Sequence, residues 1–552
     1  MSSELFTFLV GGKAGEGVKK AGSVAAHIFS AMGRHIFQMD DYMSLIRGGH
    51  NFSVVSSDIV PVTSQYLKAH VSINFDKRSY DKHINDLTED SLILYNSDEI
   101  EDGKGIGIPL SSEAKKYPLK NLMFGVGAVA ALSATIGFDK KKMNQIIRDE
   151  YPRGIEDNIA YADKFYDLIS PECFNKFKLL KGEKKRPILS GNEAISLGAV
   201  AGGLDAYYAY PMTPASSILH FLAHHAEDFG LIVVHPESEI GVVNMAIGSA
   251  FAGAKSMVGT SGGGFALMAE GISLAGITET PILIVLSMRP GPATGVATYT
   301  EQGDLGFALN VGHGEFLRIV ASPGTIEEAF YLTSEMLDLV WKFQTPGILL
   351  TEKHLSESSM TVDLELQKSK WAEPKIHEGS NFSRYLNTED GISPLLFPPN
   401  KEIIKYCSNE HDEKGISTEE PEIIEKMHNK RRRKIESLKN YLKQINTVNV
   451  YGSGEPFIFT YGSTTMSVLE ALKYNKMDAT VIQPVYLNPL PVWILDKYKD
   501  KKAIVVEMSS LGQFSHLLQE KVGLKFYSEI QKYDGRPFDP IELSTKFMEV
   551  LK

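Results

Sequence analysis

Two acidic residues follow a short apolar run at a position where a carboxylate could exchange protons. Glu237 and Glu239 lie in HPESEIG, directly after the run LIVV and at the start of a helix-like segment. Acidic residues at a helix N-terminus commonly only compensate the helix dipole. Here, however, the following segment (VVNMAIGSAFAG) is apolar or small almost all round, so we expect a buried helix. A carboxylate at the mouth of such a helix is partly desolvated and suited to proton chemistry.

A stiff loop carries the next candidates. YPMTPASS runs from Tyr210 to Ser217, and prolines at 211 and 214 restrict the backbone around Thr213. One interpretation is a rigid strand-to-helix connector, in which Ser216 and Ser217 cap the following helix. The other is a ligand-binding loop, because open α/β sheets bind ligands at the carboxyl ends of their strands.

An arginine follows another apolar run. Arg289 lies in MRPGPATG, directly after ILIVLS and beside glycine and proline residues. Exposed arginines usually serve solubility. An arginine at the carboxyl edge of a buried strand is well suited to hold a carboxylate.

Glycine-rich segments at Gly11–Gly22 (GGKAGEGVKKAG) and Thr260–Gly271 (TSGGGFALMAEG) are predicted as turns that lead into helices. Backbone N–H groups at such a helix start can bind phosphate, and a tight turn beneath a packed helix explains the glycines equally well. In the first segment the order Gly12-x-x-Gly15-x-Gly17 reverses the dinucleotide fingerprint, and no Walker Lys-Ser/Thr follows. The spacing therefore argues against a self-contained NAD(P)-dependent oxidoreductase.

The elements that position these motifs predict an α/β protein of three domains. ILIVLSM and GILLTE are apolar runs without alternation, as in buried parallel strands, and helical patterns separate them. The central segment is therefore predicted as a doubly wound parallel sheet. The predicted boundaries are 1–185 for an N-terminal α/β domain, 186–360 for the central domain, 361–447 for a charged linker or helical insertion, and 448–552 for a small α/β domain.

The charged segment contains one predicted helix, Glu419 to Ile445, which is acidic at its start and basic further on. Its basic run KRRRK (Lys430 to Lys434) could bind RNA or a targeting receptor. Because acidic residues precede it and the whole chain is acidic, we interpret the run as a solvated helix face.

Composition narrows the classes of protein. The 552 residues carry a formal net charge of -11, which argues against nucleic acid as the main partner. The longest apolar run, Pro281 to Met288, is too short to cross a membrane, and no signal peptide is evident. The only cysteines, Cys173 and Cys407, exclude a disulfide scaffold and a [4Fe–4S] cluster held by this chain alone. We therefore expect a cytoplasmic protein without membrane contact.

The motifs also occur in a familiar order. YPMTPASS, PESEIG, TSGGGFALMAEG, MRPGPATG and TEQGDL (Thr300 to Leu305) together resemble the α subunit of 2-oxoacid:ferredoxin oxidoreductases. Further similar segments are NEHDEKG (Asn409–Gly415), VEMSSLGQ (Val506–Gln513) and KYDGRPFDP (Lys532–Pro540). The GGKAGEGV segment resembles the γ subunit of the same enzymes, fused ahead of α, so the resemblance covers nearly the whole chain.

This resemblance implies the coenzyme A-dependent oxidative decarboxylation of a 2-oxoacid to acyl-CoA and CO2, with reduction of ferredoxin. It implies a γ-type N-terminal domain, a central pyrimidine-type domain that binds thiamine diphosphate, and a last domain like the C-terminal domain of transketolase. The cofactor is expected at the interface between this chain and a β subunit.

By motif position, Glu239 is the expected catalytic glutamate, which hydrogen-bonds N1′ of the cofactor's aminopyrimidine, and Glu237 is the near alternative. Thr213 is expected to face the substrate and the thiazolium ring, and Arg289 to hold the substrate carboxylate. The other expected contacts are Tyr210 to the substrate, and Pro211 and Gly263 to the cofactor.

Absent motifs imply what the partner must bring. The family's Gly-Asp-Gly motif for Mg²⁺ and pyrophosphate does not occur, since Asp304 lacks the second glycine and Asp534 lacks the first. We therefore expect no metal in this chain, and a β subunit that carries Mg²⁺ and a [4Fe–4S] cluster in an αβ heterodimer or a dimer of heterodimers. A non-catalytic scaffold protein of the same fold is the alternative.

One departure leaves the substrate open. Many relatives carry Arg or Lys directly before the Thr-Glu-Gln step, where this chain has Tyr299. The preferred 2-oxoacid is therefore not predicted, nor is coenzyme A binding by the N-terminal domain.

Overall fold

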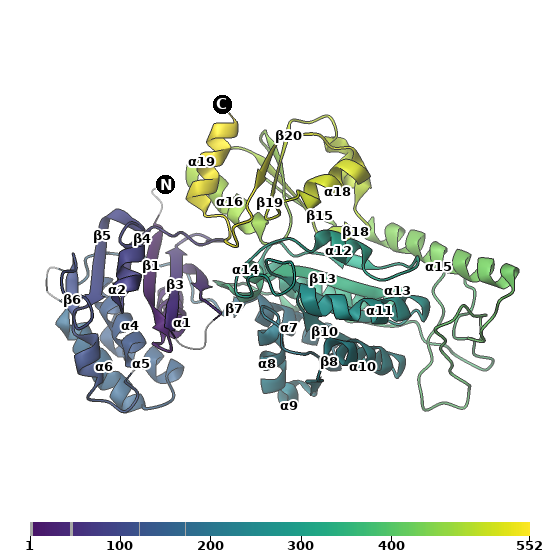
Figure 1. The fold of residues 1–552 in the computed structure, drawn as a ribbon, viewed down its shortest axis with the longest axis horizontal. Helices are drawn as coiled ribbons and strands as arrows, with labels where there is room; N and C mark the ends of the chain where they lie inside the picture. The colour runs from purple at the N-terminus through teal and green to yellow at the C-terminus, as the bar shows by residue number, and fades with distance from the viewer. Residues whose placement is uncertain (1–3, 45–47, 121, 170, 172, 552) are drawn as a thin grey trace.

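The computed structural model describes residues 4–551 apart from 45–47, 121, 170 and 172. Three β-sheets follow one another along the chain, and helices cover each of them (Figure 1). The predicted fold class, α/β with a doubly wound parallel sheet in the middle, is confirmed.

The N-terminal sheet has the strand order β6-β5-β4-β1-β3-β2-β14-β7. Its strands are β1 (Phe6–Ala14), β2 (His35–Asp41), β3 (Gly48–Asp58), β4 (Ala69–Asn74), β5 (Leu87–Asn96), β6 (Ile106–Ile108), β7 (Ile188–Ser190) and β14 (Ser359–Thr361). Its helices are α1 (Val18–Ala31), α2 (Lys77–His83), α3 (Leu110–Ala114), α4 (Met123–Thr135), α5 (Lys140–Glu150) and α6 (Ile155–Leu168). Helix α4 is apolar on every side and wholly buried, and it packs against α1 and α6.

The first glycine segment differs from the prediction. Gly11 and Gly12 belong to β1, which pairs with β3 and β4, and the turn begins only after Ala14. Gly15 and Gly17 have positive φ values of 94° and 79°, which explains glycine at both positions. The Lys13 N–H donates to the Glu16 carboxylate at 2.7 Å, so the turn is closed by its own side chain.

The central sheet has the order β18-β12-β13-β11-β10-β8-β9, and β8 to β13 run parallel. Its strands are β8 (Ala206–Tyr208), β9 (Ile232–Val234), β10 (Ser256–Thr260), β11 (Ile282–Met288), β12 (Ile319–Ala321), β13 (Pro346–Glu352) and β18 (Tyr486–Asn488). Its helices are α7 (Gly191–Ala201), α8 (Ser216–His224), α9 (Ala226–Phe229), α10 (Glu239–Phe251), α11 (Gly262–Ile277), α12 (Leu305–Asn310), α13 (Ile326–Phe343) and α14 (Lys353–Glu357).

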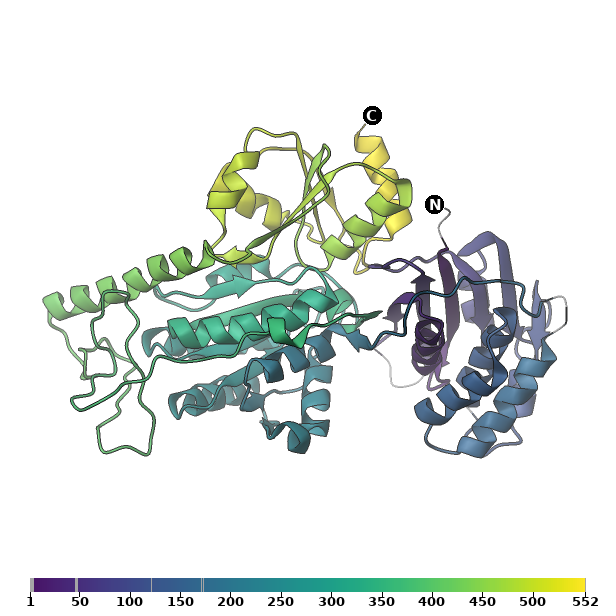
Figure 2. The same ribbon diagram turned by 180° about the vertical axis from the view of Figure 1, so that it is seen from behind.

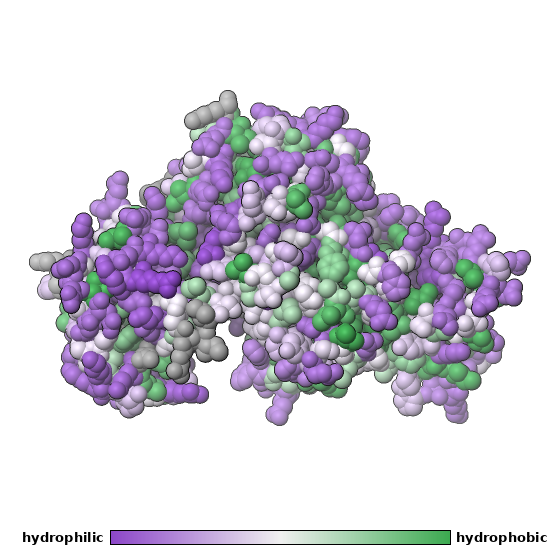
Figure 3. Space-filling model, in the orientation of Figure 1, coloured by the Kyte–Doolittle hydropathy of each residue, from purple (hydrophilic) through white to green (hydrophobic). Residues whose placement is uncertain are grey.

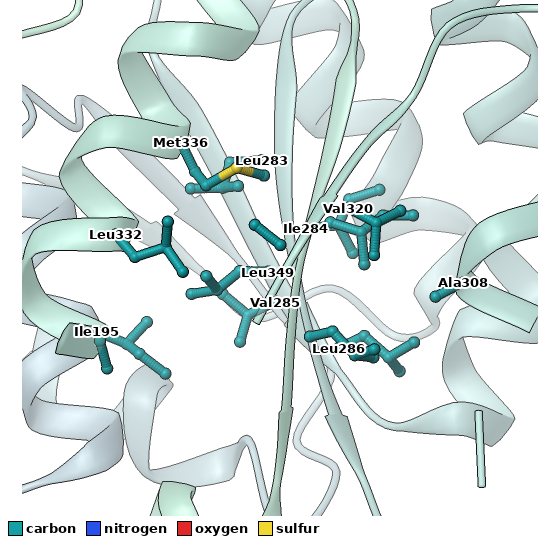
Figure 4. Packing of buried hydrophobic residues seen from close by; sticks show 14 of the residues in the cluster. Ile195, Leu283, Ile284, Val285, Leu286, Ala308, Val320, Leu332, Met336 and Leu349 are labelled. Carbon is teal, nitrogen blue, oxygen red and sulfur yellow. The ribbon is translucent and has the colours of Figure 1, made fainter. Parts of the chain in front are cut away.

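The core of the central domain lies on both faces of this sheet. Strand β11 is buried along its whole length, as the continuous apolar run predicted. One face of the sheet is covered by α7 and α13, which contribute Ile195, Leu332 and Met336 (Figure 4). Ala308 of α12 lies on the other face.

The C-terminal sheet has the order β15-β17-β16-β19-β20, parallel except for β15. Its strands are β15 (Val448–Tyr451), β16 (Phe457–Phe459), β17 (Thr480–Pro484), β19 (Ala503–Glu507) and β20 (Phe526–Gln531). Its helices are α16 (Thr464–Asn475), α17 (Val492–Leu495), α18 (Gln513–Val522) and α19 (Pro540–Val550), with a 3₁₀ turn at Asp496–Tyr498.

Between the last two sheets the chain forms an arm with a 3₁₀ turn at Leu366–Lys368 and one long helix, α15 (Pro421–Leu442). Helix α15 projects beyond the end of the central sheet, and the loops that precede it run beneath it (Figures 1 and 2). The predicted helix is confirmed, but the prediction that its basic run is a solvated face is wrong. Lys430 and Lys434 are buried, and both pair with Glu279, Lys430 at 2.6 Å.

Two sheets accept strands from outside their own stretch of sequence. β7 and β14 flank the central segment in sequence but complete the N-terminal sheet, and β18 extends the central sheet from the C-terminal segment. The predicted domain boundaries therefore stay a proposal.

No helix among the described residues is long and apolar enough to span a membrane. Cys173 and Cys407 are both partly buried and unpaired.

Candidate active site

The predicted site residues lie at one edge of the central sheet. β8, β10 and β11 are parallel neighbours, so their carboxyl ends meet at that edge. The loop after β8 carries Thr213, helix α11 begins just after β10, and Arg289 follows β11 directly. Ligands of open α/β sheets bind at such edges.

Glu239 is the first residue of α10, and Ser238 caps this helix by accepting the Gly241 N–H. The Glu239 side chain is only 4% exposed, whereas Glu237 is exposed. The two carboxylates that the sequence left as alternatives are therefore in different environments, and only Glu239 points into the protein. Its Oε1 is buried and has no hydrogen-bond partner among the described residues.

The loop after β8 and the arginine after β11 are joined by a hydrogen bond. Arg289 Nη1 donates to the Thr213 carbonyl oxygen at 2.9 Å. Tyr210 is 39% exposed, and its ring contacts that of His235 with centroids 5.8 Å apart. Pro211 is half-buried beside it. The predicted serine cap of α8 is wrong, because α8 has no side-chain cap and Ser217 Oγ accepts from Asn192 instead.

The first turn of α11 is where the two sides of the site meet. The glycines at 262–264 lie inside the helix rather than in a turn before it. A Cβ on Gly264 would lie 2.5 Å from Glu239 Oε1, and one on Gly262 would lie 2.5 Å from Asp304 Oδ2. Gly263 is exposed and has open space where a side chain would be. Glycine is required here because the helix approaches two carboxylates closely.

Asp304, which the sequence suggested only as a possible metal ligand, lies close to Gly262 and Arg289 at the same edge. Burial raises the pKa of Asp304, while the nearby Arg289 charge lowers it. Burial lowers the pKa of Arg289, which Asp304 partly offsets. Burial and the Asp304 charge also raise the pKa of Glu301. The TEQGDL motif could have indicated Asp304, because Asp304 immediately precedes α12, the next helix after the loop that carries Arg289.

Three polar atoms at this edge are buried without partners among the described residues: Glu239 Oε1, Arg289 Nε and Ser261 Oγ. Buried polar groups are nearly always hydrogen-bonded, so unpaired atoms gathered at one edge are available to a polar ligand. A carboxylate, a guanidinium and a hydroxyl group together can bind a ligand that has both hydrogen-bond donors and an anionic group.

Helices α10 and α11 pack together but leave an apolar surface open. The prediction that α10 is buried is wrong for one of its faces, since Ile240 is 52% exposed and Met245 45%. Leu267 on α11 is 51% exposed. Figure 3 shows hydrophobic side chains gathered where Figure 1 has α10 and α11. We call Ile240, Met245 and Leu267 the open face.

The TEQGDL motif fastens the site to the C-terminal domain. Gln302 exchanges hydrogen bonds with Met508, its backbone N–H donating to the Met508 carbonyl at 2.7 Å and its Oε1 accepting the Met508 N–H at 2.9 Å. Gln513 donates to the Gly303 carbonyl and accepts the Gly306 N–H. The motifs at 300–305 and 506–513 are therefore two halves of one junction.

Among the described residues, no group of three or more His, Cys, Asp or Glu side chains could hold a metal ion.

Known proteins with the same architecture define the class. Residues 197–430 match the family model "Pyruvate flavodoxin/ferredoxin oxidoreductase, thiamine diP-bdg", and residues 7–168 match "Pyruvate ferredoxin/flavodoxin oxidoreductase". The chain is 29% identical to a 2-oxoacid:ferredoxin oxidoreductase subunit alpha of Sulfolobus sp, over 99% of this chain and 97% of the relative. It is 30% identical to 2-oxoacid:ferredoxin oxidoreductase 1, subunit alpha, of Aeropyrum pernix, over 77% of this chain and 70% of the relative.

A solved structure agrees over the full length. The 2-oxoglutarate:ferredoxin oxidoreductase from Magnetococcus marinus, with 2-oxoglutarate, coenzyme A and succinyl-CoA bound, superposes with a TM-score of 0.90 at 28% identity, covering 99% of this chain and 100% of that one. The class is therefore that of ferredoxin-linked oxidoreductase subunits. The chain belongs to the family of 2-oxoacid:ferredoxin oxidoreductase α subunits, which confirms the resemblance seen in the motifs.

Proposed function

We propose that the edge formed by β8, β10 and β11 is this subunit's half of a thiamine diphosphate site, and that a β subunit covers the open face to complete it. The observation that carries the proposal is Glu239, buried at the start of α10 with one carboxylate oxygen unpartnered. Thiamine diphosphate, when bound, supplies the nucleophilic carbon and the electron sink for decarboxylation of a 2-oxoacid.

Glu239 fits the aminopyrimidine side of that cofactor. Its Oε1 is the free hydrogen-bonding atom, and Gly264 on α11 lets the helix approach this carboxylate closely, while Gly263 beside it has open space where a side chain would be. A buried carboxylate can hold or release a proton at a ring nitrogen with no competing water. Pro211 and Gly263 border the same space by their place on the neighbouring loop and helix.

Arg289 fits the carboxylate of the 2-oxoacid. Nη1 is fixed by the Thr213 carbonyl, so the guanidinium is held in one orientation while Nε stays free for a ligand. Charge-assisted bonds from a preorganised guanidinium are strong and directional. Thr213 and Tyr210 lie on the loop that faces it and complete the substrate side.

The charge state of Asp304 would affect how strongly Arg289 binds an anionic substrate. Its carboxyl lies beside Arg289 and the start of α11, and burial raises its pKa. A neutral Asp304 would leave the full Arg289 charge available to an anionic substrate, whereas an ionised one would compete for it.

The other components follow from the family. The β subunit would bring Mg²⁺ and the [4Fe–4S] cluster, coenzyme A would accept the acyl group and ferredoxin the electrons. The expected assembly is an αβ heterodimer or a dimer of heterodimers. Asp304 and Asp534 give this chain no Gly-Asp-Gly motif of its own.

The test uses the complex of this chain with its β subunit. Glu239→Gln should lower coenzyme A-dependent, 2-oxoacid-driven ferredoxin reduction by about 100-fold or more, the loss typical of a missing proton-transfer group. Glu237→Gln is the matched control, two residues away and exposed, and should keep wild-type rates. Wild-type rates in Glu239→Gln, or an equal loss in both variants, would refute the assignment.

A further inference from the structure

The loop that carries Arg289 is fastened at both of its ends. Arg289 directly follows β11, and its Nη1 donates to the Thr213 carbonyl oxygen at 2.9 Å. The loop ends at Thr300, which is 2% exposed and whose Oγ1 accepts the His354 N–H at 3.2 Å. His354 lies in α14, which directly follows β13, the neighbour of β11 in the sheet. The 289–300 loop therefore leaves one strand and is held at the end of the next.

Hydrogen bonds within the loop connect its two ends. Pro290, the second residue of the loop, accepts the Val296 N–H with its carbonyl oxygen at 3.0 Å. The Val296 carbonyl oxygen in turn accepts the Tyr299 N–H at 3.1 Å. A Cβ on Gly295 would lie 1.7 Å from the Pro290 oxygen, so this turn requires glycine. A shift at Thr300 is therefore transmitted through these bonds to the beginning of the loop.

Gly535 of the C-terminal domain packs against both ends of the loop. Its carbonyl oxygen accepts the Thr300 N–H at 3.1 Å. A Cβ on Gly535 would lie 3.3 Å from Tyr299 Cβ and 3.7 Å from Pro290 Cγ. The guanidinium carbon of Arg536 lies 3.7 Å from the centroid of the Tyr299 ring. Thr300 thus bonds the C-terminal domain with its N–H and the central domain with its hydroxyl oxygen.

The His354 backbone is a rigid anchor, because the His354 side chain contacts the two other domains. Its Nε2 lies 2.8 Å from Gln65 Oε1 in the N-terminal domain, and its Nδ1 lies 3.3 Å from Ser463 Oγ in the C-terminal domain. Gln65 Nε2 donates to the Phe538 carbonyl, so Gln65 Oε1 accepts and His354 Nε2 carries the proton. Burial lowers the pKa of His354 to about 3, so the imidazole is neutral and its Nδ1 accepts from Ser463.

We propose that Thr300 is a positioning residue for the 2-oxoacid, because its hydroxyl oxygen holds the 289–300 loop against His354 and so orients the Arg289 guanidinium. This inference rests on the proposed function, since it takes Arg289 to bind the substrate carboxylate. A guanidinium binds a carboxylate best in a fixed, directional geometry, so a loosened loop weakens substrate binding. The substrate keeps this contact through the reaction, and its loss is therefore expected in KM rather than in kcat.

The test measures steady-state rates of the αβ complex at saturating coenzyme A, with the better of pyruvate and 2-oxoglutarate as substrate. Thr300→Val removes the acceptor with little change in shape. It should raise the KM for the 2-oxoacid about 5- to 10-fold, the effect of one lost hydrogen bond, and leave kcat within about twofold of wild type. Thr300→Ser keeps the hydroxyl and should keep the wild-type KM.

Thr333→Val is the matched control, because Thr333 is a buried threonine of the same domain that donates to the Ala329 carbonyl within α13. It should leave the KM unchanged. Thr300→Ala removes the same acceptor as Thr300→Val and gives a second measurement if the valine variant does not fold.

A double-variant cycle separates positioning from a general structural role. In the Arg289→Gln complex, adding Thr300→Val should raise the KM no further, because the guanidinium that Thr300 positions is already absent. The inference is overturned if Thr300→Val keeps the wild-type KM, if it lowers kcat without raising KM, or if the effects of the two substitutions on KM multiply. A wild-type KM in the Arg289→Gln complex would instead overturn the proposed substrate site, and this inference with it.

Discussion

Helices α10 and α15 are opposite in how their composition relates to their burial. Helix α10 is almost wholly apolar, yet Ile240 and Met245 face solvent. Helix α15 is rich in charge, yet Lys430 and Lys434 are buried against Glu279, which lies just after α11. The difference shows that burial follows the partner a helix finds: α15 finds a carboxylate within the chain, whereas α10 has a face that nothing in the described chain covers.

The Glu279 cluster explains how charges can lie in the interior. Burial would raise the pKa of Glu279, but Lys430 and Lys434 together hold it well below its usual range. Arg384 donates to the Glu279 carbonyl oxygen at 2.7 Å and fixes the backbone there. Burial lowers the pKa of Lys434 to about 8 although Glu279 opposes this. The Glu279 carboxylate is therefore one of the contacts that hold the arm against the central domain.

The largest effect is expected from breaking this cluster. Glu279→Ala would leave two buried ammonium groups without their carboxylate, and removing one partner of a buried pair costs about 3–5 kcal/mol. Denaturant unfolding should show this loss. Glu436→Ala, which removes an exposed carboxylate of α15, is the control and should cost less than about 1 kcal/mol. A similar small loss for Glu279→Ala would mean that the arm is held by other contacts.

A smaller and different effect is expected on α10. Met245→Asp places a charge on the open face, so the stability of the chain alone should change by less than about 0.5 kcal/mol. Association with the β subunit should weaken by about 2 kcal/mol or more, as for a central interface residue, and titration of one subunit with the other measures this. Met548→Asp on α19 is the matched control, since Met548 is 46% exposed and Met245 45%. Equal association of both variants would contradict a partner on the open face.

A third effect depends on pH and concerns a buried carboxyl at the junction with the C-terminal domain. Glu352, at the end of β13, accepts the Ser463 N–H at 2.7 Å, and burial raises its pKa from 4.5 to about 7. Because the folded chain then binds a proton that the unfolded chain releases, the free energy of unfolding from this group falls as pH rises from about 4.5 to about 7. Glu352→Gln should therefore raise the melting temperature at pH 8 and not at pH 5.

Scanning calorimetry at both pH values checks this. Glu373→Gln, an exposed change in the arm, should shift neither value. A lower melting temperature for Glu352→Gln at pH 8 would show that the ionised carboxylate stabilises the junction.

Much of the fold, and the place of the candidate site residues in it, could be predicted because local patterns decide them. The unbroken apolar runs of β11 and β13 identify buried parallel strands, and the carboxyl end of β11 places Arg289 correctly at the sheet edge. The burial of Glu239 could be predicted because this residue lies in the first turn of an apolar helix. These features depend on short stretches of sequence and on the rule that parallel strands end together.

What could not be predicted depends on distant residues. The burial of Lys430 requires Glu279, 151 positions away. Asp304 gains its place from the close approach of Gly262, and Arg536 reaches Tyr299 from another domain. The local sequence around a charged residue does not reveal such contacts, because the same pattern of charges occurs whether the side chain faces water or a buried carboxylate.

The central claim is that the open face of α10 and α11 and the Glu239 carboxylate become one cofactor site when the β subunit binds. Calorimetric titration of thiamine diphosphate with Mg²⁺ into this chain alone, the β subunit alone and the αβ complex tests it most directly. Tight binding is expected for the complex only, with a lower affinity in the Glu239→Gln complex and an unchanged one in the Glu237→Gln complex. Tight binding by either subunit alone, or equal affinity in both variant complexes, would contradict it.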